Sequence, residues 1–364
     1  MTSERFLALD GLKGVACIFI LISHCQGYLL SKGIWMVQYL WMFNDLFMVL
    51  SGFMIAYSYK NRIKSMPLSL FFGKRYFKLM PLYWLTMTIN HAMYIIGGLI
   101  AGHSLYTERW DISRIILEYL GLYSSIWGKV RYVLNVPGWA LNCLLICYVI
   151  YYFIRKNVKE ESSYVILAVF SLAIVRRVLL VECENYLEYD FFVGSFLFFR
   201  VLAAFCIGII VYELYNVITV TGGQLISAVL CCCFFVGMVI TVLLGNENLS
   251  VYGTNDYLTG IVFFPPMLIL SAIYIKPMNK ILENRIFRFL GKISYGIYLW
   301  QGIVLNVICS RTINLADSLI GLLVAIGGTI VIAYLSYVYI EPMLHRYVNI
   351  ILGNIIKKEN QGFE

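Results

Sequence analysis

The chain has 364 residues, of which 61% are hydrophobic and only 13% are charged. A soluble domain carries about a quarter charged residues, and its core could not hide so much apolar surface. Lipid as the surrounding solvent removes this difficulty. Composition therefore excludes an ordinary soluble protein and predicts an all-α integral membrane protein.

The formal net charge of +8 could suggest nucleic acid as a partner. However, no basic run is long enough to form a binding tail, and the cations of membrane proteins collect in cytoplasmic loops. We therefore expect a lipid bilayer and no nucleic acid around this chain. The ten cysteines lie mostly inside apolar runs and form no paired CxxC pattern, so we expect free thiols and no metal site.

A transmembrane helix needs about 20 mostly apolar residues, and ten segments are candidates. The first contains Asp10 and Lys13 and has no basic segment before it, so it is expected to be a retained helix and not a signal peptide. We expect a single transmembrane domain over residues 1–346 and a short cytoplasmic tail over 347–364. The ten segments run over about 8–30, 36–59, 80–101, 138–154, 163–181, 192–213, 223–245, 258–275, 293–310 and 318–340.

The distribution of Lys and Arg predicts the orientation. With the N-terminus in the cytoplasm, 18 of the 28 cations fall in inside segments and 8 fall in outside loops. This asymmetry favours ten spans with both termini cytoplasmic. The long outside segment 102–137 is rich in Trp and Tyr. These rings could stack on sugars, although interfacial anchoring explains the same composition.

Two ionisable residues of the first span lie on one helix face. Lys13 and His24 are eleven residues apart, which is just over three turns and roughly 16 Å along the axis. Lys13 is expected near the cytoplasmic side and His24 in the outer third. A neutral imidazole can take a proton from a hydroxyl near pH 7, so His24 is either a general base or a core histidine bonded to a neighbour.

Asp45 bears on the choice between these two roles. The second span descends from outside, so Asp45 is expected at a depth comparable to that of His24. A carboxylate there could fix the tautomer of the imidazole and stabilise the imidazolium. Alternatively, Asp45 binds a polar group on another helix.

Further cations follow. Arg75 and Lys78 are three residues apart and share a helix face at the cytoplasmic end of the third span. Together they could bind a phosphorylated donor, although the preference of cations for the inside also explains them. Arg200 lies within the sixth span, where a guanidinium needs a partner or a polar cavity. His91, within the third span, is expected to be structural.

These segments resemble the membrane acyltransferase-3 family. The start RFLALDGLKGVACIFILISHCQGY resembles that family's opening, and NDLFMVLSGFMIAYSY resembles its second span. KRYFKLMPLYWL, RVLAAFCIGI, FRFLGKISYGIYLWQ and YIEPMLHR are similar to its later segments, in the same order, over about residues 5–346. The resemblance implies a ten-span enzyme that transfers an acyl group, commonly acetyl, from cytoplasmic acyl-CoA to hydroxyls of surface carbohydrates.

Roles carry over by position. The resemblance implies that His24 is the general base, and we expect Asp45 to orient it. Arg75 and Lys78 match the family's paired arginines linked to the donor, and Lys13 matches an arginine eleven residues before the histidine. Asp45 and Arg200 match residue types of the family, and we expect Lys13 and Arg200 to bind the donor together with Arg75 and Lys78. Ser51 and Gly52 also match residue types of the family.

Four positions of this chain depart from the family's pattern. Lys13 and Lys78 stand where the family has arginines, and lysine keeps the charge but loses the bidentate fork. Leu144 stands where many members have a glutamate. Gln301 replaces a late histidine, so this position cannot act as a second base.

We therefore expect an O-acetyltransferase of the bacterial inner membrane, with acyl-CoA as co-substrate, a carbohydrate acceptor and no bound cofactor. A transporter or flippase that moves a polar glycan intermediate without acyl chemistry is the alternative, although no paired halves with broken helices are evident. A structural partner of a glycan assembly complex is a third possibility, which the ionisable residues within the spans disfavour.

Overall fold

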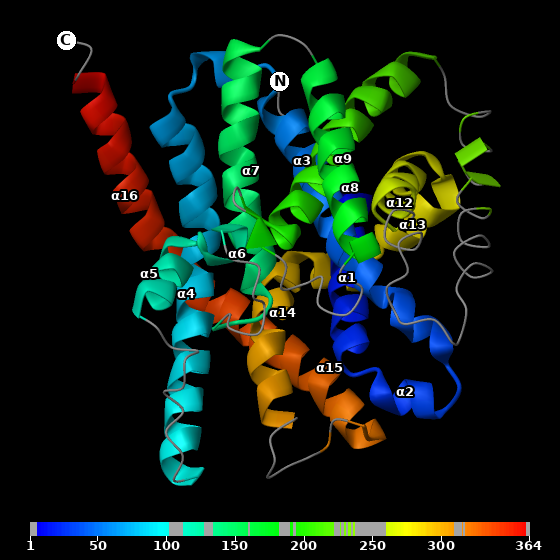
Figure 1. Cartoon of the computed structure of the whole chain (residues 1–364), viewed down its shortest axis with the longest axis vertical. Coiled ribbons are helices and arrows are strands. Elements are labelled where there is room, and N and C mark those ends of the chain that lie inside the picture. Colours follow the sequence, from blue (N-terminus) through cyan, green and yellow to red (C-terminus); the bar gives the residue numbers. More distant parts are fainter. Residues whose placement is uncertain are drawn as a thin grey trace.

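The computed structural model describes residues 6–101, 112–126, 134–158, 161–181, 190–191, 194–221, 260–308, 315 and 317–361, and a few single positions between 226 and 236. These residues are almost entirely helical, which confirms the predicted all-α class. Two strands of two residues each, β1 (Asp190–Phe191) and β2 (Gly194–Ser195), form one antiparallel pair. Figure 1 shows a bundle of long helices, with both marked ends of the chain at its upper end.

The first half of the chain contributes four long helices and several short ones. They are α1 (Leu7–His24), α2 (Gly27–Ser31), η1 (Trp35–Trp41), α3 (Met42–Tyr59), η2 (Ile63–Ser65), α4 (Leu68–Ala101), α5 (Ile112–Leu120), α6 (Tyr123–Ile126) and α7 (Gly138–Asn157). The second half adds α8 (Ser162–Val181), α9 (Phe196–Thr221), α12 (Phe264–Tyr274), α13 (Lys276–Leu282), α14 (Arg285–Ile308), α15 (Leu319–Leu335), the π-helical turn η6 (Ser336–Ile340) and α16 (Glu341–Gln361). α16 runs through the domain boundary that we expect at residue 346.

Six helices among the described residues are long and apolar enough to cross a membrane, which makes this a multi-pass membrane protein. A seventh is added if the pair Gly260–Tyr274 and Lys276–Leu282, bent by 92°, is one broken span. α4 and α14 have 34 and 24 residues, but each begins with a charged segment. The expected span 223–245 lies largely outside the described residues. The number ten and the orientation therefore stay predictions. The six helices are Leu7–His24, Trp35–Tyr59, Gly138–Asn157, Ser162–Leu179, Phe196–Thr219 and Leu319–Ile351.

Glycines set the closest helix crossings. A Cβ placed on Gly52 of α3 would lie 2.0 Å from the carbonyl oxygen of Phe205 in α9. A Cβ on Gly208 of α9 would lie 2.0 Å from the carbonyl oxygen of Val49 in α3. Apolar surface alone does not drive helices together in lipid, so such close backbone packing is a main source of their association.

The pair α1 and α14 crosses in the same way. A Cβ on Gly14 would lie 2.6 Å from the backbone nitrogen of Gly291, and one on Gly291 would lie 2.0 Å from the carbonyl oxygen of Asp10. One turn further along, the Cys17 thiol donates a hydrogen bond to the Ser294 carbonyl at 3.0 Å. These contacts advance together along both helices, so α1 and α14 are parallel.

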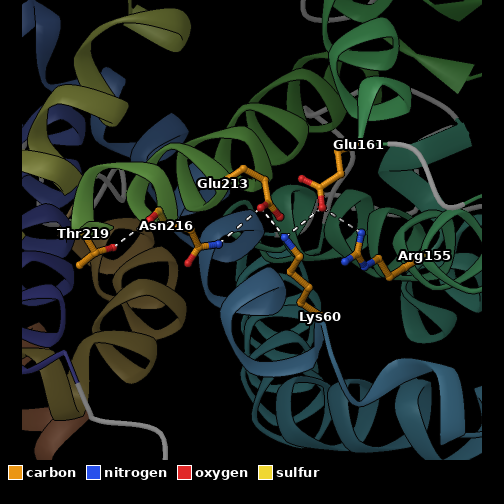
Figure 2. A network of polar contacts seen from close by, with 6 residues as sticks. All are labelled: Lys60, Arg155, Glu161, Glu213, Asn216 and Thr219. Carbon is orange, nitrogen blue, oxygen red and sulfur yellow. Dashed lines mark hydrogen bonds and ion pairs between the residues drawn. The ribbon is translucent and has the colours of Figure 1, made fainter. Parts of the chain in front are cut away.

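A polar network joins α3, α7, α8 and α9 at one end of the bundle (Figure 2). The Lys60 ammonium contacts the carboxylates of Glu213 and Glu161, the latter at 2.9 Å. Arg155 reaches the same Glu161 oxygen at 3.3 Å, and Asn216 donates to Glu213 at 3.4 Å. Burial alone would raise the pKa of Glu161, but the hydrogen bond from Lys60 and the nearby cations hold this pKa below its ordinary value.

We predict that Gly52→Ala destabilises the protein by about 2–3 kcal/mol, because the new methyl group overlaps the α9 backbone. Thermal unfolding in detergent, followed by size-exclusion fluorescence, measures the change. Gly327→Ala is the matched control, since nothing lies within 4 Å of a Cβ at Gly327. Equal melting temperatures for Gly52→Ala and Gly327→Ala would contradict the proposed crossing.

We predict that the Lys60 network stabilises the protein most at pH values above the ordinary pKa of a carboxyl group. A group whose folded pKa is lowered stabilises the fold above its unfolded pKa, and this stability is lost as pH falls through the folded value. Lys60→Met should lower stability by about 1 kcal/mol near neutral pH, since Glu161 is partly exposed and screened. The difference from wild type should shrink below about pH 4. Lys64→Met, which changes an exposed lysine of η2, is the control, and a difference independent of pH argues against the ion pairs.

Candidate active site

A cavity of about 590 Å³ lies among α1, α3, α4, α7, α14 and the start of α16. Its charged lining includes the cations Lys13, Arg75, Lys78 and Lys292 and the acids Asp10 and Glu341. The cations outnumber the acids, and His345 lies beside them. The cavity therefore favours an anionic ligand.

The two ends of the cavity differ in polarity. Its α3 lining runs from Phe47 to Ser58, a rise of roughly 16 Å. α1 and α3 are antiparallel, since Phe6 packs against Tyr57 and Phe19 packs against Phe43. The end near Ser58 is therefore on the side where α1 begins, and the end near Phe47 lies in the middle of the bundle.

Apolar side chains dominate the inner end. Phe47 packs against Tyr298 of α14, with ring centroids 5.8 Å apart. Leu141 and Leu144 of α7 line the cavity beside them. Leu144 is the residue that replaces the family's glutamate, so the departure noted in the sequence lies within the cavity and makes its wall apolar. The cavity can therefore hold a charged group at one end and an uncharged, partly apolar group at the other.

Three of the four predicted donor-binding residues meet in this cavity. Lys13 is hydrogen-bonded to Asp10 at 3.1 Å. The Arg75 guanidinium lies 4.6 Å from the centre of the Tyr59 ring, and its buried Nε has no hydrogen-bond partner among the described residues. Lys78 is exposed. Arg75 also lines a second cavity of about 420 Å³, together with Arg62 and Lys74, so the cationic surface continues outward.

Arg200, the fourth predicted donor-binding residue, is placed differently. It does not line the cavity among the described residues, and its guanidinium donates to both oxygens of Asp45, at 2.9 and 2.7 Å. The side chains of Arg200 and Asp45 are 6% and 1% exposed. The guanidinium carbon also lies 5.3 Å from the centre of the Trp41 ring and 5.6 Å from the centre of the Trp139 ring. Arg200 therefore has the partner that its depth requires, and that partner is Asp45.

His24 lies apart from Asp45. His24 is five residues beyond Phe19, and Asp45 is two residues from Phe43 in the opposite direction. Phe19 and Phe43 pack against each other and so lie at the same height along the antiparallel helices α1 and α3. His24 and Asp45 are therefore separated by roughly 10 Å along the helix axes. The expected similarity in depth is thus not found, and no hydrogen bond joins these two residues in the described part of the chain. His24 is exposed at the end of α1.

Sequence reasoning missed three residues of the cavity. Lys292 stands within the segment FLGKISYG, next to Gly291 at the crossing with α1, and this position could have indicated its proximity to Lys13. Glu341 and His345 share one face of α16, four residues apart. The closing segment YIEPMLHR contains both, but only the fold shows that α16 returns to the cavity.

The chain belongs to a family of acyltransferases: residues 6–338 match the family described as an acyltransferase domain. A segment of 94 residues is 34% identical to "Protein 2 in picA locus" of Rhizobium radiobacter, covering 25% of this chain and 47% of that relative. The chain thus spans about half the length of this relative. No solved structure matches the chain. The expected family is confirmed.

We predict that the Asp45–Arg200 pair stabilises the bundle as one unit. Asp45→Leu or Arg200→Met alone leaves an unpaired buried charge and should cost about 3–5 kcal/mol. The double variant removes both charges and should lose clearly less than the sum of the two single losses. Unfolding in detergent measures all three variants. Additive losses would show that the two side chains do not act as a pair.

Proposed function

We propose that this acyltransferase transfers an acetyl group from acyl-CoA to a hydroxyl of a cell-surface or lipid-linked carbohydrate, with His24 as the general base. One observation carries this proposal: a cationic cavity with an apolar inner end lies beside α1, and His24 lies further along the same helix. The proposal further places the protein in a bacterial cytoplasmic membrane, with the cavity open to the cytoplasm and His24 toward the outside.

The cavity suits an acyl-CoA. Charge-assisted hydrogen bonds from Lys and Arg are the usual means of binding phosphate oxygens, and the CoA phosphates would bind to Arg75, Lys78 and Lys292 at the outer end. The Nε of Arg75, which has no partner among the residues that the structure describes, could donate to such a ligand. The uncharged acyl-bearing arm would extend along the apolar wall formed by Leu141 and Leu144. Lysines at positions 13 and 78 act as point charges, without the two-pronged geometry of arginine.

The reaction balances with the groups present. The His24 imidazole takes the proton of the acceptor hydroxyl, and the hydroxyl oxygen attacks the thioester carbonyl carbon. A C–O bond forms, and the C–S bond breaks. The CoA thiolate leaves and receives the proton from the His24 imidazolium. The products are an O-acyl ester and free CoA, and no further reactant is required.

Asp45 takes a supporting role in this proposal. Both of its oxygens are bonded to Arg200, so it does not hold the imidazole directly. The pair ties the start of α3 to α9, next to the inner end of the cavity. Asp45 is thus proposed as a positioning residue.

We predict that His24→Ala lowers acetyl transfer by at least about 10²-fold, the scale of general base catalysis. The measurement follows label from [¹⁴C]acetyl-CoA into membrane glycans in vesicles from expressing cells. His91→Ala, on α4, is the matched control and should keep transfer within about twofold, because His91 lies outside the proposed site. Both variants should match wild type in yield and melting temperature.

Full transfer by His24→Ala would refute His24 as the base. A protein that consumes no acetyl-CoA, yet moves a glycan intermediate across vesicles, would favour a transporter instead.

A further inference from the structure

Three residues within one turn of α14 carry buried polar side-chain atoms without partners among the described residues. The Tyr298 hydroxyl, the Trp300 indole nitrogen and both amide atoms of Gln301 have no hydrogen-bond partner among the described residues. The three residues are 8%, 7% and 1% exposed. Buried polar groups in proteins nearly always have a partner, and an unpaired one is costly in a low-dielectric interior. Such a concentration indicates a site for a polar ligand.

Helix register places Gln301 opposite His24. α1 and α14 are parallel, and Gly14 meets Gly291. The Cys17 thiol bonds to the Ser294 carbonyl, 277 residues further along the chain. The Gly14–Gly291 contact has this same offset of 277. Continued for two more turns, it pairs His24 with Gln301. Gln301 also lies in the stripe of α14 that faces α1, because Val304 and Ile308 pack with Leu21 and Cys25.

A path leads along α14 from the cavity to this point. Ser294, Tyr298 and Gln301 are spaced four and three residues apart, so they share one helix face. Ser294 and Tyr298 line the cavity, and Gln301 is the next position inward. Two of the other three tyrosines of the lining have occupied hydroxyls: Tyr148 is bonded to Ser51 at 2.7 Å, and Tyr295 donates to the Leu79 carbonyl. The third, Tyr337, is exposed. Tyr298 is therefore the buried tyrosine of the lining whose hydroxyl has no partner among the described residues.

We propose that the Gln301 carboxamide is the oxyanion-stabilising group of the reaction, and that the Tyr298 hydroxyl guides the thioester arm from the cavity to it. This inference rests on the proposed function. The Gln301 amide donates a hydrogen bond to the thioester carbonyl oxygen. As the acceptor oxygen attacks, negative charge develops on the carbonyl oxygen and this hydrogen bond strengthens.

The different roles of His24 and Gln301 follow from the chemistry of their side chains. His24 can take up and release a proton near neutral pH, whereas a carboxamide only donates and accepts hydrogen bonds. His24 therefore moves the acceptor proton to the leaving thiolate, and Gln301 stabilises the charge that appears in between. To reach Gln301, the arm separates the Phe47 and Tyr298 rings, which meet at the inner end of the cavity.

The test uses the full chain in membrane vesicles, with acetyl-CoA as the donor and label transfer as the readout. Gln301→Leu should lower kcat by about 10²–10³-fold and leave KM for acetyl-CoA within about twofold, because the interaction forms chiefly in the transition state. Gln301→His restores a hydrogen-bond donor, and its kcat should be at least about tenfold higher than that of Gln301→Leu. Tyr298→Phe should mainly raise KM for acetyl-CoA.

Ser271→Ala on α12 is the structural control, since it also removes a buried hydroxyl that has no partner in the described part of the chain. It should keep kcat, and all variants should melt near wild type. A Gln301→Leu variant with kcat within threefold of wild type overturns the inference, as does a kcat loss that Gln301→His fails to reduce. If His24→Ala abolishes transfer while Gln301→Leu keeps it, only this inference fails. If His24→Ala keeps full transfer, the proposed base fails, whatever Gln301→Leu does.

Discussion

The close crossing of α1 and α14 is the contact on which the rest of the site depends. The two backbones approach so closely at Gly14 and Gly291 that neither position has room for a side chain. In lipid, where apolar surface gives little reason for helices to associate, such contact fixes both distance and register. The same crossing brings Lys13 and Lys292 to one cavity. Further along, its register sets His24 opposite Gln301.

The Asp45–Arg200 pair allows two charged side chains to be buried within the bundle. A charge deep in a membrane protein is expensive, and each partner reduces the cost of burying the other. The bidentate geometry also fixes how α3 lies against α9, next to the crossing at Gly52 and Gly208. The inner end of the cavity is thereby held on two sides, by the glycine crossing and by the ion pair.

Much of this arrangement could be predicted from the sequence, for physical reasons that differ between residues. The length of the apolar segments predicts the helices, because a segment that crosses lipid must form all its backbone hydrogen bonds internally. The cations Lys13, Arg75 and Lys78 follow from charge at helix ends and from family resemblance. The partner of Asp45 could not be predicted, since Arg200 is 155 residues away and only the register of α3 against α9 joins them. The same holds for Glu341, which lines the cavity because α16, near the end of the chain, packs back against it.

The balance of charge in the cavity has a consequence for turnover. Under the proposed function, the phosphates held by Arg75, Lys78 and Lys292 are present in CoA after the acyl group has left. The cations then bind product as well as substrate, and loss of the small acyl group changes little at the charged end. Departure of free CoA would compete with chemistry as the slowest step. Asp10 and Glu341, which lie among these cations, weaken the attraction for the phosphates. They would therefore help to set how fast free CoA leaves and a new acyl-CoA binds.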